Sequence, residues 1–323
     1  SAIYVESNCI VDNNEINGDY SSDVIEINGS DVSVYNNTIN QTGGGEVIWV
    51  DGENGIEIYD NTVNISSGAK FLAATSSQVS VHHNLIQTNS GRGIEIYNTS
   101  GGDIYNNTLI SNSGDYGIHI SNLSQPVVKS NIITGFQNGI YDDNALANYG
   151  LAFNNFWEIS GSLFEGPDLP SVIGEMITEN ANADSSDIYN NISFDPVFVA
   201  PGSGDYSLQV TSPCINAGDP STTSPDGTVA DIGAFYYHIY VIVDHTPLGL
   251  TSDAQGPYTV TAVAYSPAGN AVNASLFYRV NGGDFMELVM ELRGSEARPY
   301  TERDTPIFTC IARDLPDTLD SLG

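Results

Sequence analysis

The segments Val-Ser-Val-Tyr-Asn-Asn (32–37), Ile-Glu-Ile-Tyr-Asp-Asn (56–61), Val-Ser-Val-His-His-Asn (79–84) and Asp-Ile-Tyr-Asn-Asn (103–107) are versions of one motif. Aligned on its last residue, the motif recurs every 23 or 24 residues, at Asn14, Asn37, Asn61, Asn84, Asn107, Asn131 and Asn155, and returns 36 residues later at Asn191. Apolar residues lie three positions before each asparagine, and polar or aromatic residues flank them. This alternation predicts short strands with one buried face.

A second strand recurs in the same period, for example at 25–27, 48–50, 94–96 and 118–120. A repeat of this length with two or three short strands predicts one coil of an all-β solenoid, whose core is a column of stacked coils. We expect the asparagines to stack inward at one turn, each amide bonding to the next about 4.8 Å away.

The motif V-x-V-Y-N-N-x-I resembles that of right-handed parallel β-helix proteins, the pectate-lyase-like superfold, over residues 1–236. The resemblance implies the fold but no single activity, because the superfold hosts lyases, hydrolases, esterases, epimerases and non-catalytic surface proteins. Residues 194–236, with Phe194-Asp195-Pro196 and Ser212-Pro213-Cys214, are similar to the C-terminal cap of secreted bacterial β-helix proteins that carry a sorting or anchoring module. This likeness implies an extracellular or cell-surface protein, and the cap is expected to cover the open end of the solenoid.

The period ends near residue 237. Residues 237–290 contain four strand-like stretches and predict part of an immunoglobulin- or fibronectin-like β-sandwich. Residues 291–323 hold four of the eight basic residues and several prolines, so we expect an atypical tail without strands, disordered or not native to the gene.

The charge of the chain excludes several classes of partner. Eight Lys and Arg against 40 Asp and Glu give a formal charge of −32, which disfavours binding to nucleic acid or to an anionic membrane. No apolar stretch reaches the roughly 18 residues of a membrane span, and three cysteines are too few for a disulfide framework. No motif for an organic cofactor is present, and nothing indicates an oligomeric state.

Candidate catalytic residues lie on the outward face of the second strand. There the repeat predicts two columns, Glu26, Trp49, Leu72, Glu95, His119 and Tyr141, and beside it Asn28, Asp51, Ala74, Tyr97, Ser121 and Asp143. Glu95 and Asp143, two coils apart, would be separated by roughly 10 Å, near the wide end of an inverting glycosidase pair. His119 and Tyr141 would complete the site, Arg92 could hold a sugar carboxylate, and Lys129 is the fallback base of a lyase. Alternatively, carboxylates of an acidic solenoid align here by chance.

Substrate-binding and metal sites are also suggested. An outward stripe of rings is formed by Tyr35, Tyr59, His82 and Tyr105. The stripe could be a platform that binds sugars, with Trp49 on the neighbouring face. Alternatively, the rings stack only to stabilise the solenoid, with Lys129 in a cation–π contact. Asp219, Asp226 and Asp231 could bind calcium (Ca2+). The acidic insertion between Asn155 and Asn191 could form a lid.

Two functions therefore remain open. The first is an extracellular enzyme, lyase or glycoside hydrolase, that acts on a linear polysaccharide along the solenoid. The second is a non-catalytic adhesion or carbohydrate-binding module, for which the solenoid serves as a rigid spacer.

Overall fold

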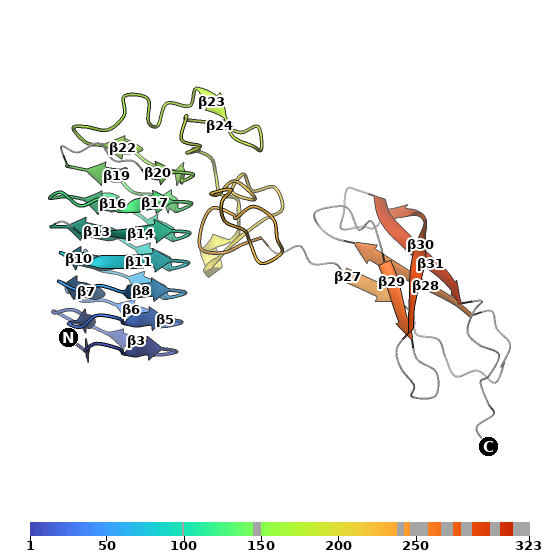
Figure 1. Ribbon diagram of the computed structural model, residues 1–323, viewed down its shortest axis with the longest axis horizontal. Helices are drawn as coiled ribbons and strands as arrows, with labels where there is room; N and C mark the ends of the chain where they lie inside the picture. Colours follow the sequence, from blue (N-terminus) through green and yellow to red (C-terminus); the bar gives the residue numbers. More distant parts are fainter. Residues whose placement is uncertain are drawn as a thin grey trace, which may run out of the picture. The chain divides into compact units, whose positions relative to one another are not determined.

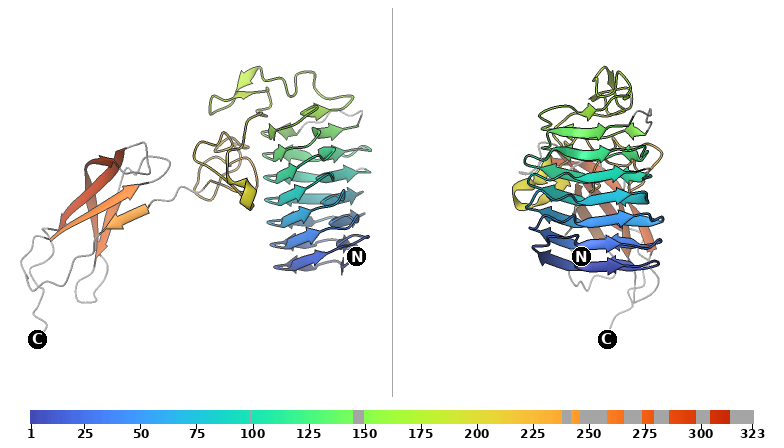
Figure 2. Two further views of the ribbon diagram at one scale, coloured as in Figure 1. Left: turned by 180° about the vertical axis from the view of Figure 1, so that it is seen from behind. Right: turned by 90° about the vertical axis from the view of Figure 1, so that its left-hand side faces the viewer.

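The computed structural model describes residues 1–98, 100–144 and 150–237, and the backbone of strands 242–245, 258–265, 274–278, 286–297 and 304–312. The chain divides into two units, Ser1–Tyr237 and His238–Gly323. In the first unit, short strands wind into stacked coils that form three parallel sheets (Figures 1 and 2). Among the described residues, no helix is long and apolar enough to cross a membrane.

Each coil contributes one strand to each sheet. Sheet A contains β1 (Ile3–Val5), β4 (Ile25–Ile27), β7 (Ile48–Asp51), β10 (Leu72–Thr75), β13 (Ile94–Tyr97), β16 (Tyr116–Ile120), β19 (Asn138–Asp142) and β22 (Phe164–Glu165). Sheet B contains β2 (Ile10–Asp12), β5 (Ser33–Tyr35), β8 (Ile56–Tyr59), β11 (Gln78–His82), β14 (Gly101–Tyr105), β17 (Val127–Lys129) and β20 (Leu151–Ala152). Sheet C contains β3 (Glu15–Gly18), β6 (Thr38–Gln41), β9 (Thr62–Ile65), β12 (Leu85–Thr88), β15 (Thr108–Ser111), β18 (Ile132–Thr134) and β21 (Asn155–Trp157).

The core is a column of branched apolar side chains, as the alternation predicts. The inward position of sheet B is held by Val34, Ile58, Val81, Ile104 and Val128, each fully buried. Each of these residues lies opposite its counterpart in the next coil, so that β-branched side chains stack in register. Removal of these surfaces from water is the main stabilising contribution.

The asparagine ladder lies at the turn between sheets B and C. Asn84 is typical: its Nδ2 donates to Asn107 Oδ1 at 2.9 Å, and its Oδ1 accepts Nδ2 of Asn61 at 2.9 Å. The backbone N–H of each asparagine donates to the same Oδ1 of the next, as from Asn84 to Asn107 at 3.1 Å. The predicted inward stacking of Asn37, Asn61, Asn84, Asn107 and Asn131 is confirmed.

The seventh member of the ladder is Asn154, so the prediction of Asn155 is wrong by one residue. Asn131 Nδ2 donates to Asn154 Oδ1 at 3.0 Å, and Asn154 Nδ2 donates to Asn191 Oδ1 at 3.1 Å. This register places Leu151 and Phe156 in the core, where they fill more space than Ala152 would. The left-handed turn position before the ladder asparagine consequently falls on Phe153 (φ 58°).

The insertion after β21, residues 158–190, closes the C-terminal end of the solenoid. Ile159, Leu163, Phe164, Leu169 and Ile173 pack against the main core, and the Phe164 ring meets that of Phe156 at 4.9 Å. Strands β23 (Thr178–Glu179) and β24 (Ser185–Ser186) form a short hairpin there. The fully buried Asp187 accepts Nδ2 of Asn191 at 3.0 Å and so terminates the ladder. These contacts make the insertion an end cap rather than the predicted lid.

Residues 194–237, here called the lateral segment, lie beside the coils and not over the open end, contrary to the prediction (Figure 1). They contain β25 (Phe198–Ala200), the 3-10 turn η1 (Pro201–Ser203) and β26 (Asp205–Leu208). Ile192, Leu208, Cys214 and Ile232 form a second apolar core with Ile132 of the solenoid. Hydrogen bonds such as Gly233 N–H to Ser130 O at 2.8 Å attach the segment laterally.

The second unit contains one five-stranded antiparallel sheet in the order β27-β28-β31-β30-β29. Its strands are β27 (Ile242–His245), β28 (Tyr258–Tyr265), β29 (Ala274–Tyr278), β30 (Met286–Ala297) and β31 (Asp304–Ala312). The expectation that residues 291–323 contain no strand is wrong, because β31 pairs with both β28 and β30. The β-branched and aromatic residues of Ile307–Ile311 favour this extended pairing, which outweighs the nearby prolines.

Candidate functional site

Four of the predicted catalytic residues meet on the outer face of sheet A. Glu95 lies opposite His119 in the adjacent coil, and His119 lies opposite Tyr141. Asp143 follows β19 directly and approaches His119 from the next coil. Together with Lys70 and Arg92 these residues form what we call the sheet A cluster.

The two outward columns predicted from the sequence contain one error of register, at Leu72 and Ala74. Ala73, not Leu72, lies between Trp49 and Glu95, and Thr75, not Ala74, lies between Asp51 and Tyr97. Leu72 and Ala74 are fully buried in the core. The run Phe71–Ala74 is apolar throughout and has no alternation to mark its faces.

Glu95 is an ionised and nearly buried anion at the centre of the cluster. Its carboxylate accepts hydrogen bonds from Lys70 Nζ and from Arg92 Nη1, the latter at 2.9 Å. Burial raises the pKa of this carboxyl, but the hydrogen bonds from His119 and Lys70 and the charges of Lys70 and Arg92 outweigh burial and lower it to about 2. A group that holds its proton so weakly cannot serve as a general acid near neutral pH.

His119 connects the two carboxylates. Its Nδ1 lies 2.9 Å from Glu95 Oε1, and its Nε2 lies 3.4 Å from Asp143 Oδ2. The ring also stacks on Tyr141, with centroids 5.1 Å apart. Glu95 and Asp143 therefore share a face as expected, but the imidazole lies between them, where an inverting hydrolase would need its attacking water.

Both cations of the cluster form ion pairs. Lys70 Nζ lies 3.5 Å from Glu46 in addition to its bond with Glu95, and Arg92 Nη2 lies 3.2 Å from Asp115. The Arg92 guanidinium also lies over the ring of Tyr116, 5.4 Å from its centroid. Side-chain exposures of 26% for Lys70 and 33% for Arg92 leave each cation partly open to a ligand.

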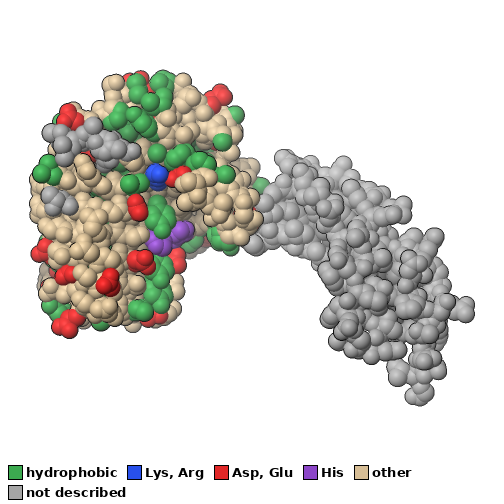
Figure 3. Space-filling view, viewed as in Figure 1, with side chains coloured by type: hydrophobic (Ala, Val, Ile, Leu, Met, Phe, Trp, Pro, Cys, Tyr) green, Lys and Arg blue, Asp and Glu red, His purple; other side chains and the backbone are tan. Residues whose placement is uncertain are grey.

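The aromatic stripe on sheet B is a continuous stack. Ring centroids are 4.8 Å apart for Tyr35 and Tyr59, 5.0 Å for Tyr59 and His82, and 4.8 Å for His82 and Tyr105. Figure 3 shows this face as a line of hydrophobic and histidine side chains bordered by carboxylates. Because the rings cover one another, a sugar could reach only their edges.

Trp49 lies on sheet A, beside the stripe and not in it, as expected; its ring centroid is 6.3 Å from that of Tyr97, with the rings tilted by 59°. One further predicted site differs from expectation. Lys129, expected over an aromatic ring, forms an ion pair with Asp219 Oδ2 at 2.8 Å. This pair joins the solenoid to the lateral segment and leaves Lys129 poorly suited to act as a base.

The predicted calcium ligands serve other partners. Asp226 accepts hydrogen bonds from Thr228 in its own loop, and the nearly buried Asp231 accepts the backbone N–H groups of Asn216 and Tyr237. Burial raises the pKa of Asp231 despite these bonds. Within the described residues, no three His, Cys, Asp or Glu side chains form a group that could hold a metal ion, so Asp219, Asp226 and Asp231 are not assembled into one site.

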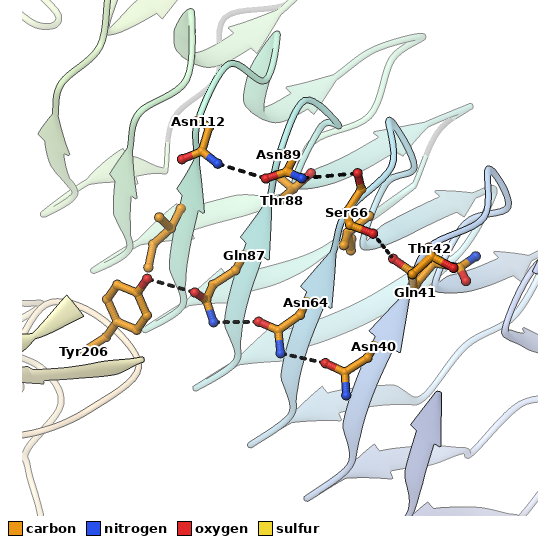
Figure 4. Close-up of a pocket in the computed structure, with 12 residues that line it drawn as sticks. Asn40, Gln41, Thr42, Asn64, Ser66, Gln87, Thr88, Asn89, Asn112 and Tyr206 are labelled. Carbon is orange, nitrogen blue, oxygen red and sulfur yellow. Dashed lines mark hydrogen bonds between the residues drawn. The ribbon is translucent and has the colours of Figure 1, made fainter. Parts of the chain in front are cut away.

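A groove on sheet C was missed by the sequence analysis. It has a volume of about 430 Å³ and lies between strands β6, β9, β12 and β15 and Tyr206 of the lateral segment (Figure 4). The signal that could have located it is an amide three residues after each of the first four ladder positions, at Asn17, Asn40, Asn64 and Gln87. Tyr206, more than a hundred residues away, has no periodic signal.

Residues 1–133 match the family described as a right-handed beta helix region. With the three parallel sheets and the internal ladder, the match identifies the architecture. The first unit is a right-handed parallel β-helix. This fold is shared by polysaccharide lyases, hydrolases and other proteins, so the β-helix alone assigns no substrate. No curated protein matches the chain.

Proposed function

We propose that this β-helix is an extracellular enzyme that acts on a linear polysaccharide, with His119 as the proton-transferring residue. The observation that carries the proposal is the orientation of His119 by the ionised Glu95, with the other ring nitrogen directed toward the more exposed Asp143. A carboxylate at Nδ1 holds the proton on that nitrogen, and Nε2 is then the nitrogen that can accept another. Glu95 acts as a positioning residue and not as an acid.

Elimination from a uronate-containing polymer fits this arrangement better than hydrolysis, because the imidazole fills the space between the two carboxylates. In that reaction Nε2 of His119 takes the proton from the carbon beside the uronate carboxylate. The electron pair of that C–H bond forms a C=C bond to the next carbon, the C–O bond at that carbon breaks, and its electron pair leaves with the oxygen. Arg92 would neutralise the uronate carboxylate, and the hydroxyl of Tyr141 would donate the proton that the leaving oxygen needs.

The test is a screen of polyuronates and neutral polysaccharides with the full chain, with and without calcium, which reads both the absorbance of unsaturated products and new reducing ends. We expect an unsaturated product from a polyuronate, and a loss of at least ~100-fold in kcat for His119→Gln. The matched control is His82→Tyr, a histidine change on sheet B, which should retain activity. Glu95→Gln should lower kcat and shift its pH profile, because His119 loses its orienting anion.

A second candidate function is a non-catalytic carbohydrate-binding module. The sheet A cluster supports this candidate, because Lys70, Arg92 and His119 all bond to Glu95. Such a network can stabilise the outer face of the sheet without any role in catalysis. Absence of product from every polymer in the screen would refute the enzyme and favour this module.

A further inference from the structure

The groove on sheet C differs chemically from the rest of the protein. Its lining consists of Asn, Gln, Ser, Thr and Ile side chains and one tyrosine, without an acid or a base. The chain as a whole carries 40 acidic residues, so an uncharged groove of this size is a local departure from its composition. Such a surface is suited to an uncharged ligand that carries many hydroxyl groups, because amides both donate and accept hydrogen bonds.

One wall of the groove is a column of amides linked by hydrogen bonds in a single direction. Gln87 Nε2 donates to Asn64 Oδ1 at 2.7 Å, Asn64 Nδ2 to Asn40 Oδ1 at 2.9 Å, and Asn40 Nδ2 to Asn17 Oδ1 at 2.6 Å. Figure 4 shows the first two of these bonds, with Tyr206 at the end of the column. We call Asn17, Asn40, Asn64 and Gln87 the amide column; the last three line the groove, and Asn17 continues the row beyond it.

The side chains of the amide column have N–H donors and oxygen lone pairs that the column does not use. A side-chain amide has two N–H donors and two acceptor lone pairs, and the column uses one donor and one acceptor of Asn40, Asn64 and Gln87. The column bonds also fix the orientation of each amide, so a ligand would not have to order these side chains. Preorganisation of this kind lowers the entropic cost of binding.

The geometry of the column points to a linear ligand. Asn40 lies opposite Asn64 and Asn64 opposite Gln87 on neighbouring strands, so the amides repeat at the ~4.8 Å spacing of a parallel sheet. The row runs along the solenoid axis, and a chain of sugar rings laid along it would present hydroxyl groups to successive amides.

The groove is closed at one end. In sheet C, Gln87 is followed by Ile110, which interrupts the row of amides. Tyr206 donates its hydroxyl to Gln87 Oε1 at 2.8 Å, and its ring, half-buried against Phe198, lies at this end of the column (Figure 4). The aromatic ring offers an apolar surface to a sugar ring, and the closed end limits the site to a few sugars.

We propose that this groove is a binding site for a short segment of a linear neutral glycan, separate from the sheet A cluster. The amide column recognises the hydroxyl groups, and Tyr206 closes the site. This proposal does not depend on catalysis, because sheets A and C face different sides of the coils.

The test is titration calorimetry of the full chain with neutral hexasaccharides (cello-, xylo-, manno- and malto-hexaose) and with hexagalacturonate as the charged probe. We expect at least one neutral hexasaccharide to bind, and an excess of hexagalacturonate not to displace it from the groove. Asn64→Ala and Gln87→Ala should each weaken binding of the neutral probe about tenfold or more, and Tyr206→Phe should weaken it less than Tyr206→Ala.

The matched control is His119→Gln, which should leave this binding unchanged whether or not it abolishes activity. Thermal unfolding of each variant separates loss of binding from loss of folding, and Asn64→Ala is a replacement in a half-buried surface position. Failure of all four neutral probes to bind at millimolar concentration would overturn the proposal, as would full binding by a folded Asn64→Ala, Gln87→Ala double variant.

Discussion

Replacement of Asn84 by leucine tests the asparagine ladder directly. Asn84 is fully buried in the fourth coil, and its Oδ1 accepts both the backbone N–H of Asn61 at 3.1 Å and Nδ2 of Asn61 at 2.9 Å. Its Nδ2 donates to Asn107 Oδ1, Ile58 O and His82 O at 2.9 to 3.0 Å. Leucine has a similar size but replaces none of these bonds.

The expected loss of stability follows from the groups that remain. The backbone N–H of Asn61 loses its acceptor in the buried interior, and the carbonyl groups of Ile58 and His82 each lose a donor. Nδ2 of Asn61 keeps Val34 O and Tyr59 O, and Asn107 Oδ1 keeps the backbone N–H of residue 84. A buried unsatisfied group costs roughly 1–3 kcal/mol, and the added apolar contact of leucine offsets part of the remaining loss, so we expect a loss of about 1–3 kcal/mol in the free energy of unfolding. The fifth and third coils should loosen first, because their amides lose partners.

Urea unfolding followed by tryptophan fluorescence measures this loss in the β-helix alone, because both tryptophans of the chain, Trp49 and Trp157, lie in it. Asn112→Leu is the matched control: Asn112 is exposed and bonds to Asn89, so its replacement should change stability by less than ~0.5 kcal/mol. Equal unfolding midpoints for the two variants would refute a stabilising role of the ladder.

Three further predictions concern charge. Burial, with a smaller effect of the neighbouring His83, lowers the pKa of His82 from 6.5 to about 4. Between pH 6.5 and 4 the unfolded chain therefore binds a proton at His82 that the folded chain does not, and the free energy of unfolding should fall as the pH drops through this range. His82→Tyr, which copies Tyr59 and Tyr105, should reduce that dependence in urea unfolding at each pH. Glu95, with a pKa of about 2 against an ordinary 4.5, should contribute stability that is complete above pH 4.5 and lost as the pH falls toward 2; Glu95→Gln should lack this step in acid titrations. With 40 acidic residues, the protein should melt at a higher temperature in ~1 M NaCl, and calcium that acts no better than sodium at equal ionic strength would leave only screening.

The repeat made most of the β-helix predictable from sequence, and the one error in the ladder shows where such patterns fail. Asn154 and Asn155 are adjacent, and either continues the period of 23 or 24 residues. Local turn preference favours an asparagine in the left-handed position, which would place the ladder at Asn155. Packing of the core outweighs this preference, because Leu151 and Phe156 fill the apolar core when Asn154 occupies the ladder position.

For the candidate site, the sequence predicted which residues share an outward column but not how their side chains contact one another. Period and strand alternation placed Glu95, His119 and Tyr141 in adjacent coils, as observed. The contribution of Lys70 and the position of the imidazole between two carboxylates depend on side-chain conformations that no periodic pattern specifies. The lateral segment was harder still, since contacts such as Tyr206 with Gln87 join residues from non-periodic and periodic parts of the chain.

A comparison of the two outer columns shows why the proposals assign them different roles. In the sheet A cluster Lys70 and Arg92 form ion pairs with Glu95, Glu46 and Asp115, so a ligand must compete with these contacts. The contact between His119 Nε2 and Asp143, at 3.4 Å and partly exposed, is longer than the bond to Glu95, so Nε2 is the nitrogen at which proton transfer is expected. The amide column has no charges to separate, and each amide keeps a donor and an acceptor for a ligand. We therefore expect binding of a neutral glycan at sheet C and proton transfer at sheet A, so that loss of glycan binding in Gln87→Ala and loss of turnover in His119→Gln should occur independently.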